Sequence, residues 1–337
     1  MKKMVILHII IGIGVVVQAQ KYYISNLYMY DMFLMNPANA GSDKDCYSFG
    51  LFYQNQWLGM EDSPTTQIFN AQGPLSKSLG FGTYVYNDRN GNMKEFGLHQ
   101  SLSYEVLLGK SRRHISKLAF GLAFSVEQSS IDESNFQNNT TIIDPLIHGG
   151  ISSGWGYNSN AGVIFMYDDY HIGFSVTNML NQTNPLYKGD GEPGLPMDWH
   201  LFLSGMYKVV DRDVFLEPMV MVRGNSETDK RVDLSLKGTF PTPNPMYALW
   251  GLVAYRRTMD DNFGKSLGMA ATMGVNYQRI SLGLEYQLGL TRAQLEYGSA
   301  YQLVLRYTIC NNLKHHAIPC SEARKNKKSR YSGMIWY

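Results

Sequence analysis

The chain has 337 residues, of which 44% are hydrophobic and 17% charged, and its formal net charge is +2. It is too apolar for a disordered protein, and its charged fraction lies below the roughly 25% of a typical soluble domain. After residue 19 no apolar run approaches the roughly 18 residues of a membrane-spanning helix, which argues against a helical membrane protein. With 3 cysteines there is no disulfide framework, although Cys310 and Cys320 could bond in an exported chain.

The first nineteen residues have the pattern of a secretory signal peptide. Lys2 and Lys3 precede an apolar run from residue 4 to residue 17, and the stretch ends at Val17-Gln18-Ala19. Such a pattern predicts cleavage after Ala19. No cysteine follows the cleavage point, which argues against a lipid anchor there.

Large apolar residues alternate with small or polar ones along almost the whole chain from residue 46 to residue 309. Between Leu118 and Val126, for example, every second residue is large and apolar, and the residues between them are Ala, Gly or Ser. A period of two is the pattern of a β-strand with two different faces. It predicts about fourteen strands, at approximately 46–53, 65–73, 79–86, 96–108, 117–129, 156–167, 170–180, 200–210, 214–224, 231–240, 247–257, 267–278, 280–289 and 300–309.

The connections between these strands are alternately long and short. Residues 130–155 and 181–199 are among the long connections, whereas residues 168–169 and 211–213 are among the short ones. Each predicted strand has about the 9–11 residues that a tilted strand needs to cross a bilayer. Long loops at one end and short periplasmic turns at the other are typical of an outer-membrane β-barrel. A soluble all-β fold, the alternative, gives no reason for this sorting of the loops.

These features divide the chain into four segments. Residues 1–19 are the signal peptide, and residues 20–45 are a periplasmic segment that leads into the barrel. Residues 46–309 form an all-β, transmembrane outer-membrane barrel of about 14 antiparallel strands with long extracellular loops, and residues 310–337 form a short basic periplasmic tail.

The basic tail has three interpretations. Such a stretch is most often simply solvated, but it could also grip anionic lipid head groups or dock an acidic periplasmic protein. Its two terminal aromatic residues favour docking, because aromatic side chains are typical interface anchors. The candidate docking residues are Lys325, Lys327, Lys328, Trp336 and Tyr337.

The strand face expected to line the lumen mixes small residues with charges of both signs. These charges include Glu105, Lys208, Asp233, Lys237, Glu285 and Arg306. Opposite charges in one lumen more often pair, or hold a plug, than select an ion. A general porin is therefore not expected.

Several motifs that could carry chemistry have simpler interpretations. Residues 150–154 match the G-x-S-x-G pattern of hydrolases, but no helix follows them, as that chemistry requires. The pairs Asp168-Asp169 and Asp260-Asp261 suit a tight turn and a solvated loop. His315-His316 fits no zinc-ligand spacing. The sequence predicts no enzyme, no cofactor, no metal site and no nucleic-acid partner.

A short segment ahead of the first predicted strand carries a family resemblance. Its Asn-Pro and Ala-Gly pairs are turn signals that close an apolar stretch. The segment resembles the Asn-Pro-Ala-x-Ala-Gly signature near the start of mature PorP/SprF proteins, which are outer-membrane proteins of the type IX secretion and gliding apparatus of the Bacteroidota. The matching residues are Asn36, Pro37, Ala38, Ala40 and Gly41.

Further similarities to this family follow in the family's order, up to about residue 309. The next family residues are Trp57, Pro64, Asn87, Asp88 and Gly91. Residues 173–178 and 301–307 also resemble family strands. The chain departs from the family at Asn39, where an aromatic residue is usual, and the long basic tail is less typical.

The resemblance implies a non-enzymatic barrel that anchors or couples periplasmic components of the machinery and assists the secretion of surface proteins. The partners it implies are a ring lipoprotein complex, an OmpA-like peptidoglycan-binding protein and a secreted surface protein or adhesin, with outer-membrane lipid around the barrel. A substrate-specific channel for small molecules is the alternative. An outer-membrane hydrolase is a third hypothesis, for which no residue constellation was found.

Overall fold

The computed structural model describes residues 27–111, 114–134, 136, 149–180, 183, 185–186, 194–209, 214–225, 230–244, 246–259, 266–289 and 292–310. The predicted signal peptide and the tail beyond Cys310 lie outside these residues. The strands are β1 (Cys46–Asn55), β2 (Thr65–Pro74), β3 (Leu79–Asn90), β4 (Met93–Lys110), β5 (Ile115–Asp132), β6 (Ile151–Tyr167), β7 (Tyr170–Thr177), β8 (Asp198–Gly205), β9 (Tyr207–Lys208), β10 (Phe215–Asn225), β11 (Lys230–Pro241), β12 (Tyr247–Thr258), β13 (Ser266–Tyr277), β14 (Ile280–Leu288) and β15 (Ala300–Cys310).

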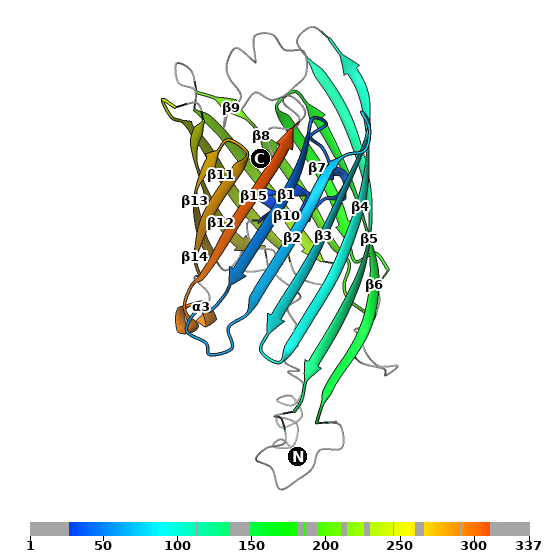
Figure 1. Ribbon diagram of the computed structural model, residues 1–337, viewed down its shortest axis with the longest axis vertical. Helices are drawn as coiled ribbons and strands as arrows, with labels where there is room; N and C mark the ends of the chain where they lie inside the picture. The colour runs from blue at the N-terminus through cyan, green and yellow to red at the C-terminus, as the bar shows by residue number, and fades with distance from the viewer. Residues whose placement is uncertain are drawn as a thin grey trace, which may run out of the picture.

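All of these strands belong to one antiparallel sheet that closes on itself (Figure 1). Strands that are consecutive in the chain are neighbours in the sheet, and the last strand, β15, pairs with β1. Strands β8 and β9 lie on either side of Met206 and both pair with β10, so they form one interrupted span. The result is a closed barrel of 14 strands, and the predicted outer-membrane barrel is confirmed.

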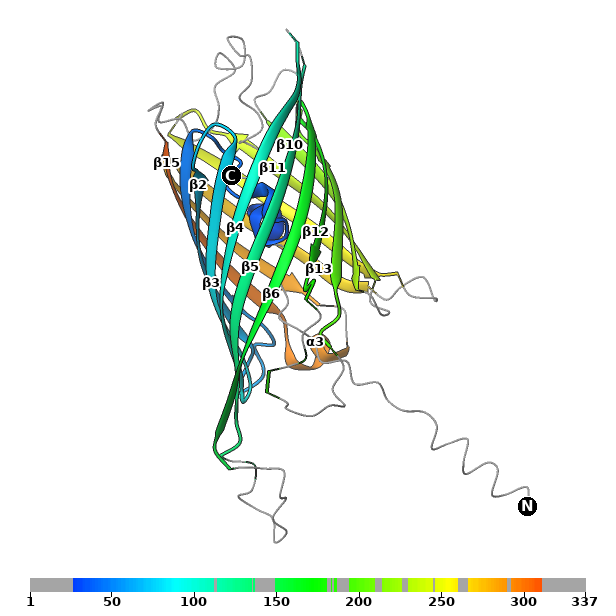
Figure 2. The ribbon, with the colours of Figure 1, turned by 90° about the vertical axis from the view of Figure 1, so that its right-hand side faces the viewer.

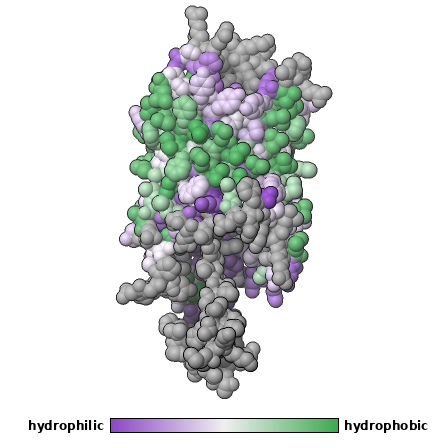
Figure 3. All heavy atoms as spheres, turned by 180° about the vertical axis from the view of Figure 1, so that it is seen from behind, coloured by the Kyte–Doolittle hydropathy of each residue, from purple (hydrophilic) through white to green (hydrophobic). Residues whose placement is uncertain are grey.

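The alternation of residue types explains the two faces of the wall. On β5, Phe120, Leu122 and Phe124 are exposed, whereas Gly121 and Ala123 between them are buried. The same pattern on the other strands places apolar side chains around the outside of the barrel, and Figure 3 shows them as a belt on one side of it. An outward apolar band of this kind is what the bilayer requires of an outer-membrane barrel. Separately, no helix in the described part of the chain has the length and apolar character to cross a membrane.

The segment before β1 lies inside the barrel. It consists of α2 (Leu27–Tyr30), η1 (Met32–Leu34) and η2 (Pro37–Asn39), and Figure 2 shows it as a dark-blue coil enclosed by the strands. The sequence placed residues 20–45 in the periplasm, whereas residues 28–41 are buried in the lumen. The physical reason is that their large apolar side chains, among them Tyr28, Met32 and Phe33, are removed from water there.

Closure of the barrel also determines which two cysteines form the disulfide. Cys46 begins β1 and Cys310 ends β15, and the two residues are paired in the β1–β15 register. They form a disulfide with a Cα–Cα distance of 4.0 Å. The sequence suggested Cys310 with Cys320, which is wrong, because closure brings a cysteine 264 positions away directly opposite Cys310.

The connection before β15 contains a short helix that the sequence did not predict. This helix, α3 (Arg292–Tyr297), lies in the expected loop 290–299. Backbone hydrogen bonds join the end of α3 and the residue before β15 to the β1–β2 connection. Gly59 N donates to Tyr297 O at 2.7 Å, and Leu58 N donates to Ser299 O at 3.3 Å. The long connections at this end of the barrel therefore contact one another across the β1–β15 seam.

Candidate functional site

The candidate site is the lumen together with the segment that fills it, residues 28–41, called the lumen segment below. Tyr28, Met29 and Met32 form one apolar cluster with residues of the far wall such as Phe202 and Met221. On the other side, Tyr30 and Phe33 pack against the near wall in a second cluster. The Tyr30 ring centroid lies 5.3 Å from that of Trp250. The lumen segment therefore bridges opposite walls of the barrel with apolar contacts.

A buried carboxylate anchors the lumen segment to two strands. Asp31 Oδ2 lies 2.8 Å from Arg306 Nη2 on β15, and the two side chains are 0% and 3% exposed. On β2, Asn70 Nδ2 donates to Asp31 Oδ2 at 2.7 Å and Gln72 Nε2 donates to Asp31 Oδ1 at 2.9 Å. Arg306 also donates to Tyr30 O at 2.9 Å. Both buried charges are thus paired and hydrogen-bonded, as low-dielectric surroundings require.

A second polar contact holds the start of the lumen segment at the opposite wall. The Tyr28 hydroxyl donates to Asp233 Oδ2 on β11 at 3.1 Å. Arg223 Nη2 on β10 lies 3.3 Å from the same oxygen. Burial raises the pKa of Tyr28 above its usual value, and the Asp233 carboxylate adds to the shift, so the phenol stays neutral and donates.

The family motif forms the end of the lumen segment. Asn36 caps η2, because its Oδ1 accepts from Ala38 N at 2.9 Å. Its Nδ2 reaches β7, donating to Phe174 O at 3.2 Å. Pro37 occupies the first turn of η2, where a missing N–H costs nothing. Gly41 turns the chain with φ +55° and donates its N–H to Gln72 Oε1 at 3.2 Å.

The wall carries glycines where the motif touches it. A β-carbon added at Gly121 on β5 would lie 2.1 Å from Ala38 N. One added at Gly162 on β6 would lie 2.0 Å from Asn36 Oδ1. At Gly80 on β3 the distance to Ala40 O would be 2.2 Å. We call these three residues the glycine cradle, since their missing side chains make the space for the motif backbone.

Most of the charges predicted to face the lumen are paired. Glu105 Oε1 lies 2.8 Å from Lys117 Nζ, and Glu217 Oε2 lies 3.4 Å from Lys237 Nζ. Glu285 accepts from Gln287 Nε2 at 2.7 Å and from the Thr272 hydroxyl at 3.0 Å. Lys208 on β9 is exposed, but it pairs in register with Phe215, whose side chain is buried on the lumen side of β10. In the described part of the chain, the lumen segment thus fills the lumen, and internal ion pairs neutralise most of the predicted inward charges.

The remaining family residues lie at the opposite end of the strands and do not join this site. Asp88 Oδ1 accepts from the Thr66 hydroxyl, and Pro64 O accepts from Gln56 N at 2.9 Å. Trp57 has φ +54° in the β1–β2 connection, and Gly91 has φ +58° in the β3–β4 turn. Asn87 faces outward on β3. The docking candidates Lys325, Lys327, Lys328, Trp336 and Tyr337 lie outside the described residues.

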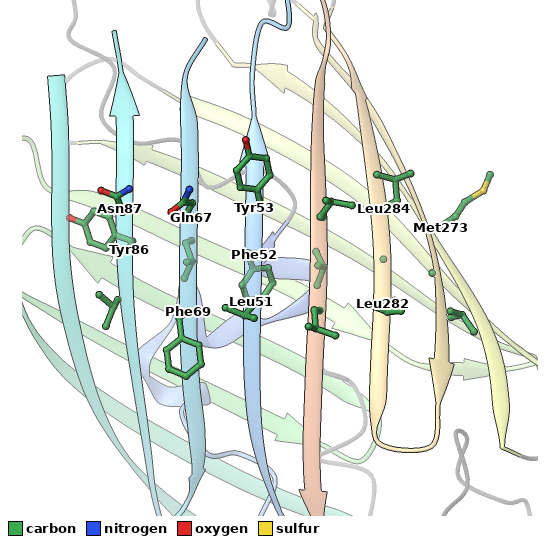
Figure 4. A pocket seen from close by; sticks show the side chains of 18 of the residues that line it. Leu51, Phe52, Tyr53, Gln67, Phe69, Tyr86, Asn87, Met273, Leu282 and Leu284 are labelled. Atoms are coloured by element: carbon green, nitrogen blue, oxygen red, sulfur yellow. The ribbon is translucent and has the colours of Figure 1, made fainter. Parts of the chain in front are cut away.

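A depression of about 990 Å³ lies on the outside of the wall rather than in the lumen. Leu51, Phe69 and Leu284 point into it from β1, β2 and β14 (Figure 4). Tyr53, Gln67 and Asn87 form a more polar edge toward the end of the barrel with the long connections. Most of its lining belongs to the outward apolar belt, although Phe52, Ile68, Tyr86 and Val304 at its base are buried, so we assign it to the lipid-facing surface.

The motifs weighed for chemistry have ordinary structural positions. Residues 151–154 begin β6 rather than a strand–turn–helix. Asp168, with φ +51°, turns the chain between β6 and β7 and accepts from Ile115 N at 2.8 Å. Asp260-Asp261 lies outside the described residues. Among the residues that are described, no group of three or more His, Cys, Asp or Glu is placed to hold a metal ion.

Sequence reasoning missed the residue that anchors the lumen segment. Asp31 is the one charged residue between Lys21 and Asp43, within an otherwise apolar and aromatic stretch. A lone carboxylate in such a stretch indicates a buried partner of opposite charge. The partner itself, Arg306, could be named only as one of several inward charges.

The chain was compared with protein families, with curated proteins and with solved structures. The pattern of type IX secretion system membrane protein PorP/SprF matches residues 17–307. None of the curated proteins matches the chain. Among solved structures, a Pseudomonas aeruginosa FadL homologue is 12% identical, with 82% of this chain and 93% of that chain covered and a TM-score of 0.49. The P. putida toluene transporter TodX is 12% identical, with 87% and 95% covered and a TM-score of 0.47.

The family pattern spans both features described above, the motif seated in the glycine cradle and the closing strand that carries Arg306. The match runs through nearly the whole barrel, from before the lumen segment into β15. The chain therefore belongs to the PorP/SprF family of type IX secretion system membrane proteins.

Proposed function

We propose that this barrel is a structural component of the type IX apparatus, which anchors or couples periplasmic components in the outer membrane and assists the secretion of surface proteins. The proposal rests on one observation above all: the lumen is occupied by the chain's own lumen segment. That segment is held by the buried Asp31–Arg306 pair at 2.8 Å and by the glycine cradle. A barrel so filled offers its two ends, rather than its interior, to other molecules.

The short turns and the carboxyl end of β15 lie at one end of the barrel, which is the periplasmic end by the rule for outer-membrane barrels. Cys310 ends β15 there, so the basic tail starts on the periplasmic side. A basic tail with terminal aromatic residues suits an acidic protein surface. We propose that the tail docks periplasmic components such as the ring lipoproteins or the peptidoglycan-binding protein that the family resemblance implies.

The test is a mild-detergent pull-down of the natively expressed chain, compared with a variant that lacks residues 311–337. We expect ring lipoprotein or peptidoglycan-binding components to co-purify with the full chain and to be lost with the tail. The truncated barrel should still insert, since β15 is complete. Equal recovery of these components with both forms would contradict tail docking.

Planar-bilayer conductance separates this function from the alternative of a small-molecule channel. We expect almost no ion current from the wild-type barrel, because the lumen segment occupies the lumen and most of the described inward charges are paired. A large, substrate-sensitive current together with an absence of co-purifying partners would favour the channel.

A further inference from the structure

The depression on the outside of the wall follows the hydrogen-bonding rows of the sheet, and it is called the wall trough below. Its two sides are rows of outward side chains that lie two residues apart on each strand, a separation of about 7 Å. The row nearer the long connections consists, in register from β3 to β13, of Asn87, Gln67, Tyr53, Leu303, Leu284 and Met273. The other row consists of Val85, Phe69, Leu51, Leu305, Leu282 and Val275. The wall trough therefore crosses the β1–β15 seam (Figure 4).

The floor of the wall trough is closed toward the lumen. The residues between the two rows point into the barrel, so the floor is mainly backbone. On β13 and β14 the floor residues are Gly274 and Gly283, which lie opposite each other. The Trp250 ring lies directly beneath them, because an added β-carbon would come within 2.1 Å of this ring at Gly274 and within 2.7 Å at Gly283. Trp250 is buried and packs against Tyr30 of the lumen segment. An occupant of the wall trough must therefore come from the membrane side.

The wall trough is apolar over most of its length and polar at its β3 end. On β2 and β3, Gln67 and Asn87 are exposed and direct their carboxamides outward (Figure 4). Within the described part of the chain, neither carboxamide takes part in a side-chain hydrogen bond. A carboxamide without a partner is unfavourable beside hydrocarbon. This end of the wall trough therefore favours a molecule that carries hydrogen-bonding groups.

The wall trough is inclined to the membrane plane. Strands of a barrel tilt and are staggered, so a row that follows the hydrogen bonds changes its depth as it passes around the wall. Asn87 lies eight residues from Leu79, where β3 ends at the short turns, whereas Met273 lies four residues from Tyr277, the corresponding end of β13. The short turns mark the periplasmic end. The polar end is therefore nearer the cell surface and the apolar end is deeper in the bilayer, as are the head group and acyl chain of a lipid in the extracellular leaflet.

The chemistry of the polar end distinguishes between kinds of head group. A carboxamide both donates and accepts hydrogen bonds, which suits sugar hydroxyls and amide linkages, whereas a phosphate prefers a cation. Among the described residues that line the wall trough there is no Lys or Arg. Arg89, two residues beyond Asn87, pairs with Asp62 at 3.0 Å. A glycolipid therefore fits this end better than a phospholipid does.

We propose that the wall trough binds a glycolipid of the extracellular leaflet. One acyl chain lies across the seam between the two rows, beside Leu303, Leu284 and Met273. Hydroxyl or amide groups at the base of the head group hydrogen-bond to Gln67 and Asn87. The proposal goes beyond the proposed function and does not depend on it, since it requires only that the barrel lies in the outer membrane.

A second barrel is a poorer occupant of the wall trough. The outer wall of a barrel is convex, so a partner barrel would meet the rim of the wall trough and leave its floor uncovered. A single acyl chain is narrow enough to lie between two rows of side chains that are about 7 Å apart.

Native mass spectrometry of the full-length protein tests lipid selectivity. The purified barrel is delipidated in detergent and titrated with monophosphoryl lipid A as the glycolipid, and separately with phosphatidylethanolamine and phosphatidylglycerol. We expect one lipid A molecule per barrel, bound about tenfold more tightly than either phospholipid. Equal affinities for the three lipids would mean that only non-selective boundary lipid covers this surface, and would overturn the proposal.

Two sets of variants test the position of the bound lipid. Leu51→Trp fills the wall trough, and the double variant Gln67→Leu with Asn87→Leu removes both carboxamides. We expect each to weaken lipid A binding about tenfold, the effect of losing about 1.4 kcal/mol. The matched control is Leu122→Trp on β5, which makes the same change at an outward residue that is 70% exposed and lies outside the wall trough. All of these changes place apolar or aromatic side chains on the lipid-facing surface, so the barrel should still assemble.

Two further outcomes would contradict the proposal. If Leu51→Trp and Leu122→Trp change lipid A binding equally, the lipid lies elsewhere on the wall. If the wild type has the mass of two barrels and Leu51→Trp that of one, the wall trough is an interface between copies. The double variant keeps the test decisive should Leu51→Trp fail to assemble.

Discussion

Asp31 in the lumen segment and Arg306 on β15 form an ion pair of 2.8 Å that is almost completely removed from solvent. One partner comes from the start of the described chain and the other from the strand that closes the barrel. The lumen segment can therefore reach its final contacts only when β15 is in place. Filling of the lumen and closure of the barrel therefore stabilise each other.

Neutralising Asp31 should loosen the lumen segment. Asp31→Asn leaves the Arg306 guanidinium buried without its counter-charge, which costs about 3–5 kcal/mol in comparable buried pairs. We expect faster proteolysis of the lumen segment in detergent and a measurable ion leak in planar bilayers. The control is Asp62→Asn, because Asp62 pairs with Arg89 on the surface, where the side chains are 63% and 52% exposed. A wild-type proteolysis rate and conductance in Asp31→Asn would contradict an anchoring role for this pair.

The glycine cradle should reject even one methyl group. Gly162→Ala would place a carbon 2.0 Å from Asn36 Oδ1, so the motif must shift and the Asn36 cap is lost. A lost cap alone costs about 1 kcal/mol, and we expect a lower thermal midpoint and a leak like that of Asp31→Asn. Gly156→Ala on the same strand is the control, since its added carbon would have no neighbour closer than 3.5 Å. Equal midpoints for the two variants would show that the motif does not need the glycine.

Loss of the disulfide should weaken the seam without opening the barrel. Cys46 and Cys310 close a loop of 264 positions, and in the chain-entropy model such a cross-link contributes up to about 5 kcal/mol. Cys46→Ser should therefore melt at a lower temperature than the oxidised wild type, and reductant should lower the wild-type midpoint to the same value. Cys320→Ser should behave as the wild type does. A free thiol on Cys310 in the natively purified protein would contradict this pairing.

The stability of the protein should also depend on pH through Asp43, which lies between the lumen segment and β1. Burial raises the pKa of Asp43 to about 6 from its usual 3.8, although the Asp45 N–H that donates to its carboxylate acts in the opposite direction. Between these two values the folded protein keeps a proton that the unfolded chain has released, so stability falls as the pH rises through this range. Asp43→Asn should remove that part of the pH dependence and raise the thermal midpoint at pH values above about 6.

The measurement is the thermal midpoint of each variant in detergent, at pH values below and above the pKa of Asp43. Glu61→Gln is the control, because it removes the same charge from an exposed position in the β1–β2 connection. If Asp43→Asn and Glu61→Gln shift the pH profile equally, net charge rather than burial of Asp43 explains the effect.

Much of the barrel could be predicted from the sequence because its information is local. Each strand carries its own two-residue period, as in residues 118–126, and the lengths of the connections show which strand ends lie together. A bilayer then leaves few alternatives, because every backbone group within it must be paired. The family motif could likewise be recognised as a turn-rich stretch ahead of the first strand.

The sequence by itself thus determined the strands, their number and the closed sheet, whereas only the tertiary structure decided what fills the barrel and what joins its ends. The sequence of an apolar stretch with one carboxylate is the same whether the stretch lies in the periplasm before the barrel or inside the lumen. Its position depends on Arg306, Gly121 and Gly162, which are far away in the chain and meet it only after closure. The same holds for Cys46 and Cys310. Local patterns specify faces of strands, but contacts across the lumen and the seam exist only when all strands have paired.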